Sequence, residues 1–268
     1  MRQVYAALLD EGIYLCSIAT MYRLLRENGQ VKERRNQARH AKHNKPVLKA
    51  TAPNQIWTWD ITKLRGSGKG NGYRLYVILD LYSRYVVGWM VAERECQHLA
   101  SQLIEQSCAK QGVSPETLTL HADRGGAMTS KTVAELLMDL GVCRSHSRPH
   151  VSNDNAFSEA AFKTLKYAPE FPGRFGSIEE ARSFCVAFFA YYNQEHYHTG
   201  IALLTPEMVH SGRALEVQLA RQATLEVAYS QKPHRFSQGI PKVLPLPEEV
   251  WINRVEPQTL MEGDPLLH

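Results

Sequence analysis

Three acidic residues stand in places where a folded chain rarely leaves a charge without a partner. Asp60 interrupts an apolar and aromatic stretch, "QIWTWDIT" at 55–62, and Asp123 directly follows an apolar run. Glu159 falls one turn into an expected helix that follows a polar loop. A buried carboxylate without a cation or hydrogen-bond donors is costly. Because Mg²⁺ prefers oxygen ligands, carboxylates that converge from separate elements could hold the two divalent ions of a phosphoryl-transfer site.

The two aspartates also have a structural interpretation. Asp60 could cap a turn and Asp123 could begin a loop, as aspartates often do. The chain holds 27 acidic residues, so spacing alone does not decide between a metal site and ordinary positions. The glycines at 125 and 126 would let backbone approach a metal ion without a Cβ in the way.

The elements that must position these residues follow from the hydrophobic periodicity. In 55–62, Thr58 and Asp60 fall on one face and Trp57 and Trp59 on the other, which predicts a strand buried on both sides. Strands are predicted at 55–62, 73–80, 84–91, 117–122 and about 142–146, and helices at 95–111, 129–140, about 154–167 and 177–194. This order predicts a mixed α/β layered domain.

Length and composition narrow the class of protein. The chain has 268 residues, and its longest apolar run, "FCVAFFAYY", is far shorter than the ~20 residues of a membrane span. No signal peptide is expected at the N-terminus. The five cysteines are scattered and never form a C-x-x-C pair, which indicates a reducing cytoplasm and argues against a zinc module.

The N-terminal part carries most of the positive charge. Residues 1–50 hold ten Lys and Arg against four Asp and Glu, which favours contact with a polyanion over an ordinary solubilising tail. Helices are predicted at 3–11 and 18–28, the second capped by Ser17. The pair resembles a helix-turn-helix unit that would carry Arg23 and Arg26 toward DNA.

These patterns divide the chain into four predicted parts. They are a helix-turn-helix-like DNA-binding element at 1–30, a basic linker at 31–52, a catalytic core at 53–212 and a C-terminal tail at 213–268. The tail is expected to contain a helix at 213–229 and an extended stretch at 240–252. Its role is left open between DNA binding and contact with another subunit.

Several stretches resemble the bacterial insertion-sequence transposases of orfB type, which belong to the retroviral-integrase-core "DDE" recombinases. Thirty-five residues separate Asp123 from Glu159, a spacing typical of that family. The likeness covers roughly residues 53–210. The matching stretches are "WTWDIT", "YVILDLYSRYVVGW", "HADRGGAMTS", "HSRPHVSNDNAFSEAAFKTLK" and "YYNQEHYHTGIALLTPEMV". The resemblance implies a ribonuclease-H-like core with a mixed five-stranded sheet flanked by helices, beside the small helical N-terminal element.

The resemblance also implies roles for individual residues. Asp60 would bridge two Mg²⁺ or Mn²⁺ ions, and Asp123 and Glu159 would each complete one of them. Contacts with DNA are expected from a further set of side chains, namely Asn155, Lys163, Lys166 and Arg124. For Asn155 the alternative is that it orders the loop, and for Arg124 that it pairs with an acid. For the two lysines the alternative is a solvated pair with Glu159 on the same helix face.

Two other acids are expected to be structural. Asp80 belongs to the hairpin turn in the family pattern, where its side chain can satisfy backbone amides across the "LYSR" bend. Asp154 is expected to help cap the helix of Glu159.

The function implied is that of a DNA transposase, which cleaves transposon ends and transfers the 3′-hydroxyl into target DNA. A metal-dependent nuclease of the same fold and a catalytically silent DNA-binding relative are the alternatives. The expected partners are double-stranded DNA, further copies of the chain on that DNA, and a second reading-frame product of the same element. The expected location is the bacterial cytoplasm, with no membrane contact.

Overall fold

We analysed a computed structural model that describes residues 2–30, 45–68, 70–113, 116–123, 125–148 and 152–254. The chain divides into two compact units, residues 1–43 and 44–268. In the described ranges, no helix combines the length and the apolar character that crossing a membrane requires. All five cysteines are free.

The first unit is a pair of short helices, α1 (Arg2–Asp10) and α2 (Ile18–Glu27). Ser17 caps α2, as predicted, because its hydroxyl accepts a hydrogen bond from the Thr20 N–H at 3.2 Å. Arg23 and Arg26 are exposed on α2. Met21 is the one residue of the two helices that is buried, so this unit has a very small core of its own.

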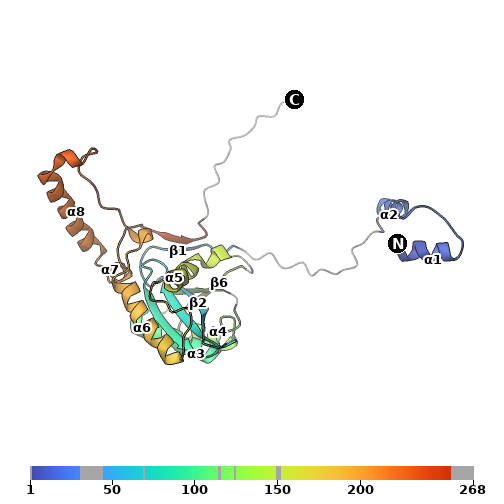
Figure 1. Cartoon of the computed structure of the whole chain (residues 1–268), viewed down its shortest axis with the longest axis horizontal. Coiled ribbons are helices and arrows are strands. Elements are labelled where there is room, and N and C mark those ends of the chain that lie inside the picture. Colours follow the sequence, from blue (N-terminus) through green and yellow to red (C-terminus); the bar gives the residue numbers. More distant parts are fainter. Residues whose placement is uncertain are drawn as a thin grey trace. The chain divides into compact units, whose positions relative to one another are not determined.

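A mixed five-stranded sheet is the centre of the second unit (Figure 1). Its order is β4-β3-β2-β5-β6. β3 pairs antiparallel with β2 and β4, whereas β5 pairs parallel with β2 and β6. The predicted fold class is therefore confirmed. The strands are β2 (Ile56–Arg65), β3 (Gly72–Asp80), β4 (Val86–Ala92), β5 (Thr119–Ala122) and β6 (Cys143–His146).

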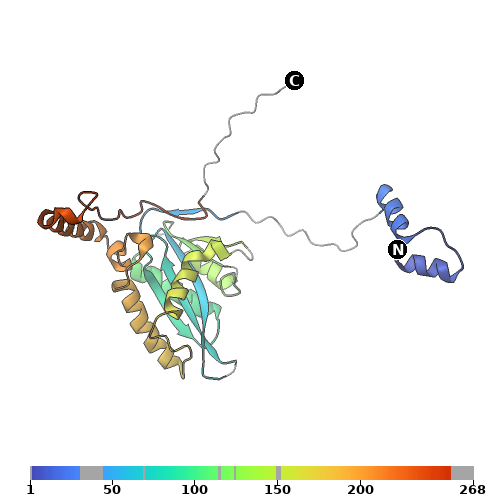
Figure 2. The ribbon, with the colours of Figure 1, turned by 45° about the horizontal axis from the view of Figure 1, so that its top comes forward.

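Helices cover both faces of this sheet (Figure 2). One face packs against α3 (Gln97–Gln111) and α4 (Lys131–Asp139), with Trp57 and Trp59 in the core between them. The other face packs against α5 (Ala156–Lys166) and α6 (Ile178–Gln194) through a second apolar cluster. The alternation of side chains predicted for β2 is confirmed. Thr58 and Asp60 lie on the face that packs against α5, opposite the two tryptophans.

Two further elements bring distant parts of the chain together. β1 (Leu48–Ala50) pairs antiparallel with β7 (Val250–Ile252), so a segment of the predicted linker meets a segment of the predicted tail. Their apolar residues pack with Ile56 and Leu81 of the core, and Phe157 of α5 lies against the same cluster. This small sheet was not predicted.

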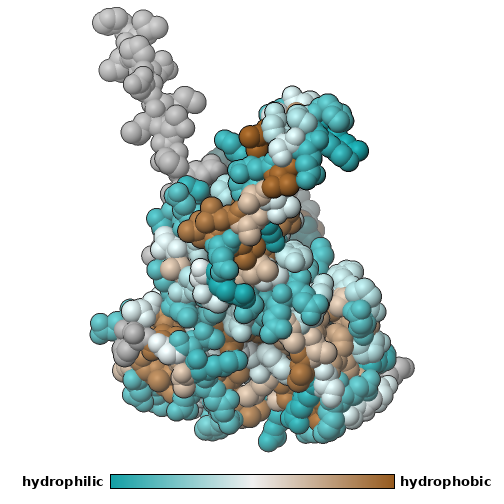
Figure 3. Space-filling view, turned by 90° about the vertical axis from the view of Figure 1, so that its left-hand side faces the viewer, coloured by the Kyte–Doolittle hydropathy of each residue, from teal (hydrophilic) through white to brown (hydrophobic). Residues whose placement is uncertain are grey.

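The C-terminal helices extend the second unit. α7 (Pro206–His210) leads into α8 (Ala214–Gln231), which projects from the core and buries only Ala214 (Figure 1). Leu215, Leu219 and Val227 of α8 are exposed, and Figure 3 shows hydrophobic surface on the side of the molecule where α8 lies.

Asp80 is a structural carboxylate, as expected. It is fully buried where β3 ends, and it accepts hydrogen bonds from the N–H of Ser83, the hydroxyl of Ser83 and the N–H of Asn54, each at 2.7 Å. These contacts hold the turn between β3 and β4 and fasten the segment that leads into β2.

We predict that Asp80→Asn destabilises the protein by about 1–3 kcal/mol, because its amide NH₂ would face a buried backbone donor. Urea unfolding followed by circular dichroism measures this change. Asp139→Asn, an exposed change at the end of α4, is the control. Equal midpoints for the two variants would contradict the structural role.

Candidate active site

The three predicted carboxylates lie on or directly after three neighbouring elements, two adjacent strands of the sheet and a helix that packs on it. Asp60 lies in the middle of β2, and Asp123 is the first residue after β5. The parallel pairing of these strands ends with Trp59 opposite Ala122, so the two aspartates follow directly on that pair. Glu159 lies in the first turn of α5, the helix that packs beside β2.

Hydrogen bonds seat α5 on β2. The hydroxyl of Ser158 donates to the hydroxyl of Thr58 at 3.0 Å, and both residues are buried. The side-chain N–H of Asn155 donates to Oδ2 of Asp60 at 2.9 Å. The helix that carries Glu159 is therefore held against the strand that carries Asp60 by contacts next to each catalytic candidate.

The electrostatics of Asp60 show that the three acids are neighbours. Burial raises the pKa of Asp60 to about 7, and the negative charges of Asp123 and Glu159 act in the same direction. Hydrogen bonds from the Ile61 N–H and from Asn155 oppose this rise. Such a crowded group of carboxylates is stabilised by any cation that binds among them.

Asp123 is held by its own loop. Its Oδ1 accepts a hydrogen bond from the Gly125 N–H at 2.8 Å, and its carbonyl accepts one from Nδ1 of His146 at 3.0 Å. A Cβ on Gly125 would lie 3.0 Å from Oδ1 of Asp123, so this glycine gives clearance to the carboxylate itself. Arg124 lies outside the described residues.

The donor set suits a hard divalent cation. It consists of three carboxylates and the side-chain oxygen of Asn155, which is buried and has no hydrogen-bond partner. Within the described ranges, no three His, Cys, Asp or Glu side chains are close enough to surround one ion. The charges of Asp123 and Glu159 act on Asp60, but the three carboxylates are not gathered tightly enough to surround a single ion.

Two lysines of α5 lie on its exposed surface. Lys166 donates to the hydroxyl of Thr62 on β2 at 2.6 Å, two residues beyond Asp60. Partial burial lowers the pKa of Lys166, and the negative charge of Asp60 opposes this change, so the ammonium lies near Asp60. Lys163 is exposed one turn earlier.

The prediction for Asp154 is wrong. Asn155 is the N-cap residue of α5, and no side chain makes the cap hydrogen bond. The Asp154 carboxylate instead binds Arg148 and Asn253. Neither partner was predicted: Arg148 stands in a quoted motif without a role, and Asn253 lies far along the chain, where no local pattern connects it to the site.

His121 is fully buried in β5. Its Nε2 donates to the carbonyl of Asp154 at 2.9 Å, and its Nδ1 then accepts from the hydroxyl of Ser145 at 3.0 Å. Burial lowers the pKa of His121, so the neutral ring is favoured. The ring links the end of β5 to the loop before α5.

We predict that Asp60→Asn stabilises the metal-free protein. Because the folded-state pKa of Asp60 lies above its unfolded value, stability is lost as pH rises from about 4 to about 7. At pH 8 the variant should gain about 2–4 kcal/mol, and near pH 4 the gain should vanish. Urea unfolding in EDTA at the two pH values measures this difference. A loss of stability at pH 8 would contradict the crowding of charge.

Comparison with known protein families agrees with this geometry. Two family models, both described as integrase core domain, match residues 50–152 and 140–206. Together they cover β2 to α6 and all three acids.

Transposases of bacterial insertion sequences are similar to this chain in sequence. The chain is 33% identical over 162 residues to the transposase of insertion sequence element IS904 from Lactococcus lactis, covering 60% of this chain and 63% of that one. It is 29% identical to the putative transposase InsK of element IS150 from Escherichia coli, covering 59% and 55%. The matched region thus spans less than two thirds of either relative.

A solved structure is also similar. The catalytic core domain of HTLV-2 integrase, determined with magnesium, matches 59% of this chain and 97% of its own at 18% identity and a TM-score of 0.45. On the sequence matches, this chain belongs to the integrase-core family, which includes transposases of bacterial insertion sequences.

Proposed function

We propose that the protein is a DNA transposase that cleaves the ends of its element and joins the freed 3′-hydroxyl to target DNA. The observation that supports this proposal is that Asp60 of β2, Asp123 directly after β5 and Glu159 of α5 are neighbours in a chain of the integrase-core family. The chain spans less than two thirds of the length of the relatives it matches. The whole reaction and its substrates are therefore part of the proposal.

Asp60, Asp123 and Glu159 would hold two Mg²⁺ ions, with Mn²⁺ as a substitute. When bound, the metal supplies an activated water or 3′-hydroxyl and stabilises the leaving oxygen. The other residues of the chain orient the carboxylates that would bind the metal. Asn155 and the Ile61 N–H fix the two oxygens of Asp60, and the Gly125 N–H orients Asp123. The repulsion among the acids then favours the metal-bound state.

DNA is the proposed substrate and partner. Lys163 and Lys166 lie along α5 after Glu159, and their proposed role is to contact phosphates beside the carboxylates. Further contacts with DNA are proposed for Asn155 and for Arg23 and Arg26 of the N-terminal unit. A DNA contact is also proposed for Arg124, on the sequence alone. Pairing two element ends requires more than one copy of the chain, and a second reading-frame product is a proposed partner. The cytoplasm is the proposed location.

Substitution of the acids tests the chemistry. Asp60→Asn, Asp123→Asn and Glu159→Gln should each lower Mn²⁺-dependent cleavage and strand transfer at least 1,000-fold, by about 4 kcal/mol, because each removes a ligand charge at the reacting phosphate. Binding to the same DNA should stay within a few-fold. The assay uses terminal-repeat oligonucleotides, one of them already ending in a 3′-hydroxyl.

Glu135→Gln, an exposed change on α4, is the matched control and should keep full activity. Cleavage without joining by the wild type would instead indicate a nuclease. Full activity in all three acid variants would overturn the assignment.

The lysines of α5 give a separate prediction. Lys163→Gln and Lys166→Gln should each weaken DNA binding several-fold and reduce the slope of log affinity against log salt by about 1, because each removes one phosphate contact. Fluorescence anisotropy at several salt concentrations measures this slope. Lys110→Gln on α3, across the sheet from α5, should leave it unchanged. An unchanged slope in both α5 variants would indicate solvated lysines.

A further inference from the structure

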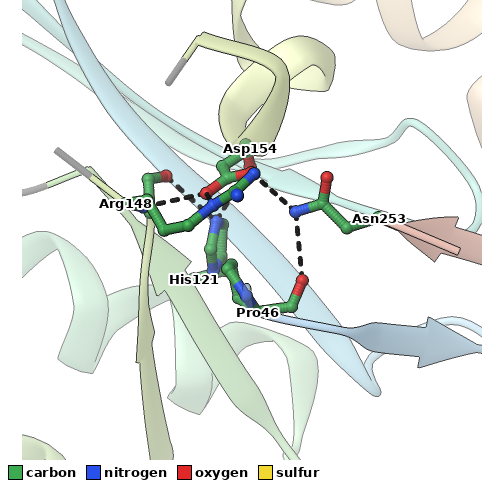
Figure 4. Close-up of polar contacts among 6 residues, drawn as sticks. Pro46, His121, Arg148, Asp154 and Asn253 are labelled. Carbon is green, nitrogen blue, oxygen red and sulfur yellow. Dashed lines mark hydrogen bonds and ion pairs between the residues drawn. The ribbon is translucent and has the colours of Figure 1, made fainter. Parts of the chain in front are cut away.

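The Asp154 carboxylate is fully buried and binds two partners from different parts of the chain (Figure 4). Arg148 donates to its Oδ2 from the backbone N–H at 2.8 Å and from Nε at 3.0 Å, and to its Oδ1 from Nη2 at 3.0 Å. Asn253 donates to Oδ1 from its side-chain amide at 2.6 Å. Burial alone would raise the pKa of Asp154, but these donors outweigh it and lower the pKa to about 2.

This cluster adjoins the proposed metal ligands. Asp154 is next to Asn155, which is the N-cap residue of the helix that carries Glu159 and whose side-chain amide donates to Asp60. The carbonyl of Asp154 also binds His121, two residues before Asp123. Asp154 is therefore connected to Asp60 through Asn155 and to the end of β5, just before Asp123, through His121.

Asn253 connects the cluster to the two-stranded sheet of β1 and β7. It follows directly on β7, with a left-handed φ of 59°. The same amide nitrogen donates to the carbonyl of Pro46, just before β1, at 3.0 Å. One side chain thus joins both strands to Asp154, at a position outside residues 50–206, which the integrase core models match.

A second contact links the same sheet to α5. Phe157, in the first turn of the helix, packs against the cluster formed by β1, β7 and Leu81. Its ring also lies 4.2 Å from the Arg84 guanidinium. The start of α5 and the turn before it therefore contact the β1–β7 sheet twice, through a polar contact at Asp154 and an apolar one at Phe157.

We propose that Asp154 is a positioning residue for the metal-binding acids, and that β7 holds it in place through Asn253. The inference rests on the proposed function, because it assigns the C-terminal strand to the apparatus that orients Asp60 and Glu159. Partners that orient metal ligands from outside are commonly worth 10- to 100-fold in metal affinity or activity.

The first test is hydrogen exchange of the full-length, metal-free protein. Asn253→Ala should speed exchange of the amides in the first turn of α5, in peptides covering 152–162, at least about tenfold, while β3 stays protected. Glu249→Gln is the matched control, since it removes the ion pairs of the half-buried Glu249 to Lys49 and Arg254 near β7, and Glu249 makes no contact with Asp154. Unchanged exchange in the Asn253 variant would overturn the proposal.

The second test separates positioning from mere stability. The Mn²⁺ concentration that gives half-maximal cleavage of terminal-repeat DNA should rise about tenfold in Asn253→Ala and in Arg148→Lys, and stay unchanged in Glu249→Gln. Arg148→Lys keeps the charge but loses the two-pronged contact, so it also serves if the Asn253 variant folds poorly.

A lower maximal rate at an unchanged metal midpoint would show that the cluster only stabilises the fold, and would overturn the proposal. A wild-type protein without metal-dependent cleavage would refute the proposed function itself, and the positioning role with it.

Discussion

The seating of α5 on β2 is the contact on which the candidate site depends. Asp60 and Asp123 are placed by the sheet, since β2 and β5 are neighbours in a continuous ladder. Glu159 has no such constraint, and it reaches them only because α5 lies along β2. That arrangement places three negative charges together, so the packing of α5 must overcome their repulsion when no cation is present. The buried contact between Ser158 and Thr58 and the apolar cluster behind α5 supply this stabilisation.

Hydrogen-bond donors distinguish the structural acids from the proposed catalytic ones. Asp80 has three donors, and Asp154 has four, including a guanidinium. Asp60 has two neutral donors and two negative neighbours. A carboxylate that is fully supplied with donors has no capacity left for a metal ion, whereas one that is crowded by like charges gains from it. The surroundings of each acid therefore indicate its role better than its position at a strand end.

Much of the core could be predicted from the sequence because its signals are local. The alternation of Trp57 and Trp59 with Thr58 and Asp60 defined the two faces of β2, and the strand boundaries lie within three residues of those predicted. The site followed from family motifs that span the same strands and helix. The role of Asp154 could not be predicted, since an aspartate before a helix looks like a cap. Its actual partners are decided by tertiary structure, and Asn253 lies 99 residues away.

The β1–β7 sheet was missed for a related reason, and that reason bears on its function. Strands of three residues carry almost no periodic signal, and an isolated two-stranded sheet is marginally stable in water. β1 and β7 therefore persist only through what they contact, namely the apolar cluster around Leu81 and Phe157 and the amide of Asn253 at Asp154. The dependence is mutual. The short sheet is stable only against an ordered turn before α5, and that turn buries the charge of Asp154, to which Asn253 donates. Ordering of the site and docking of β7 therefore favour each other.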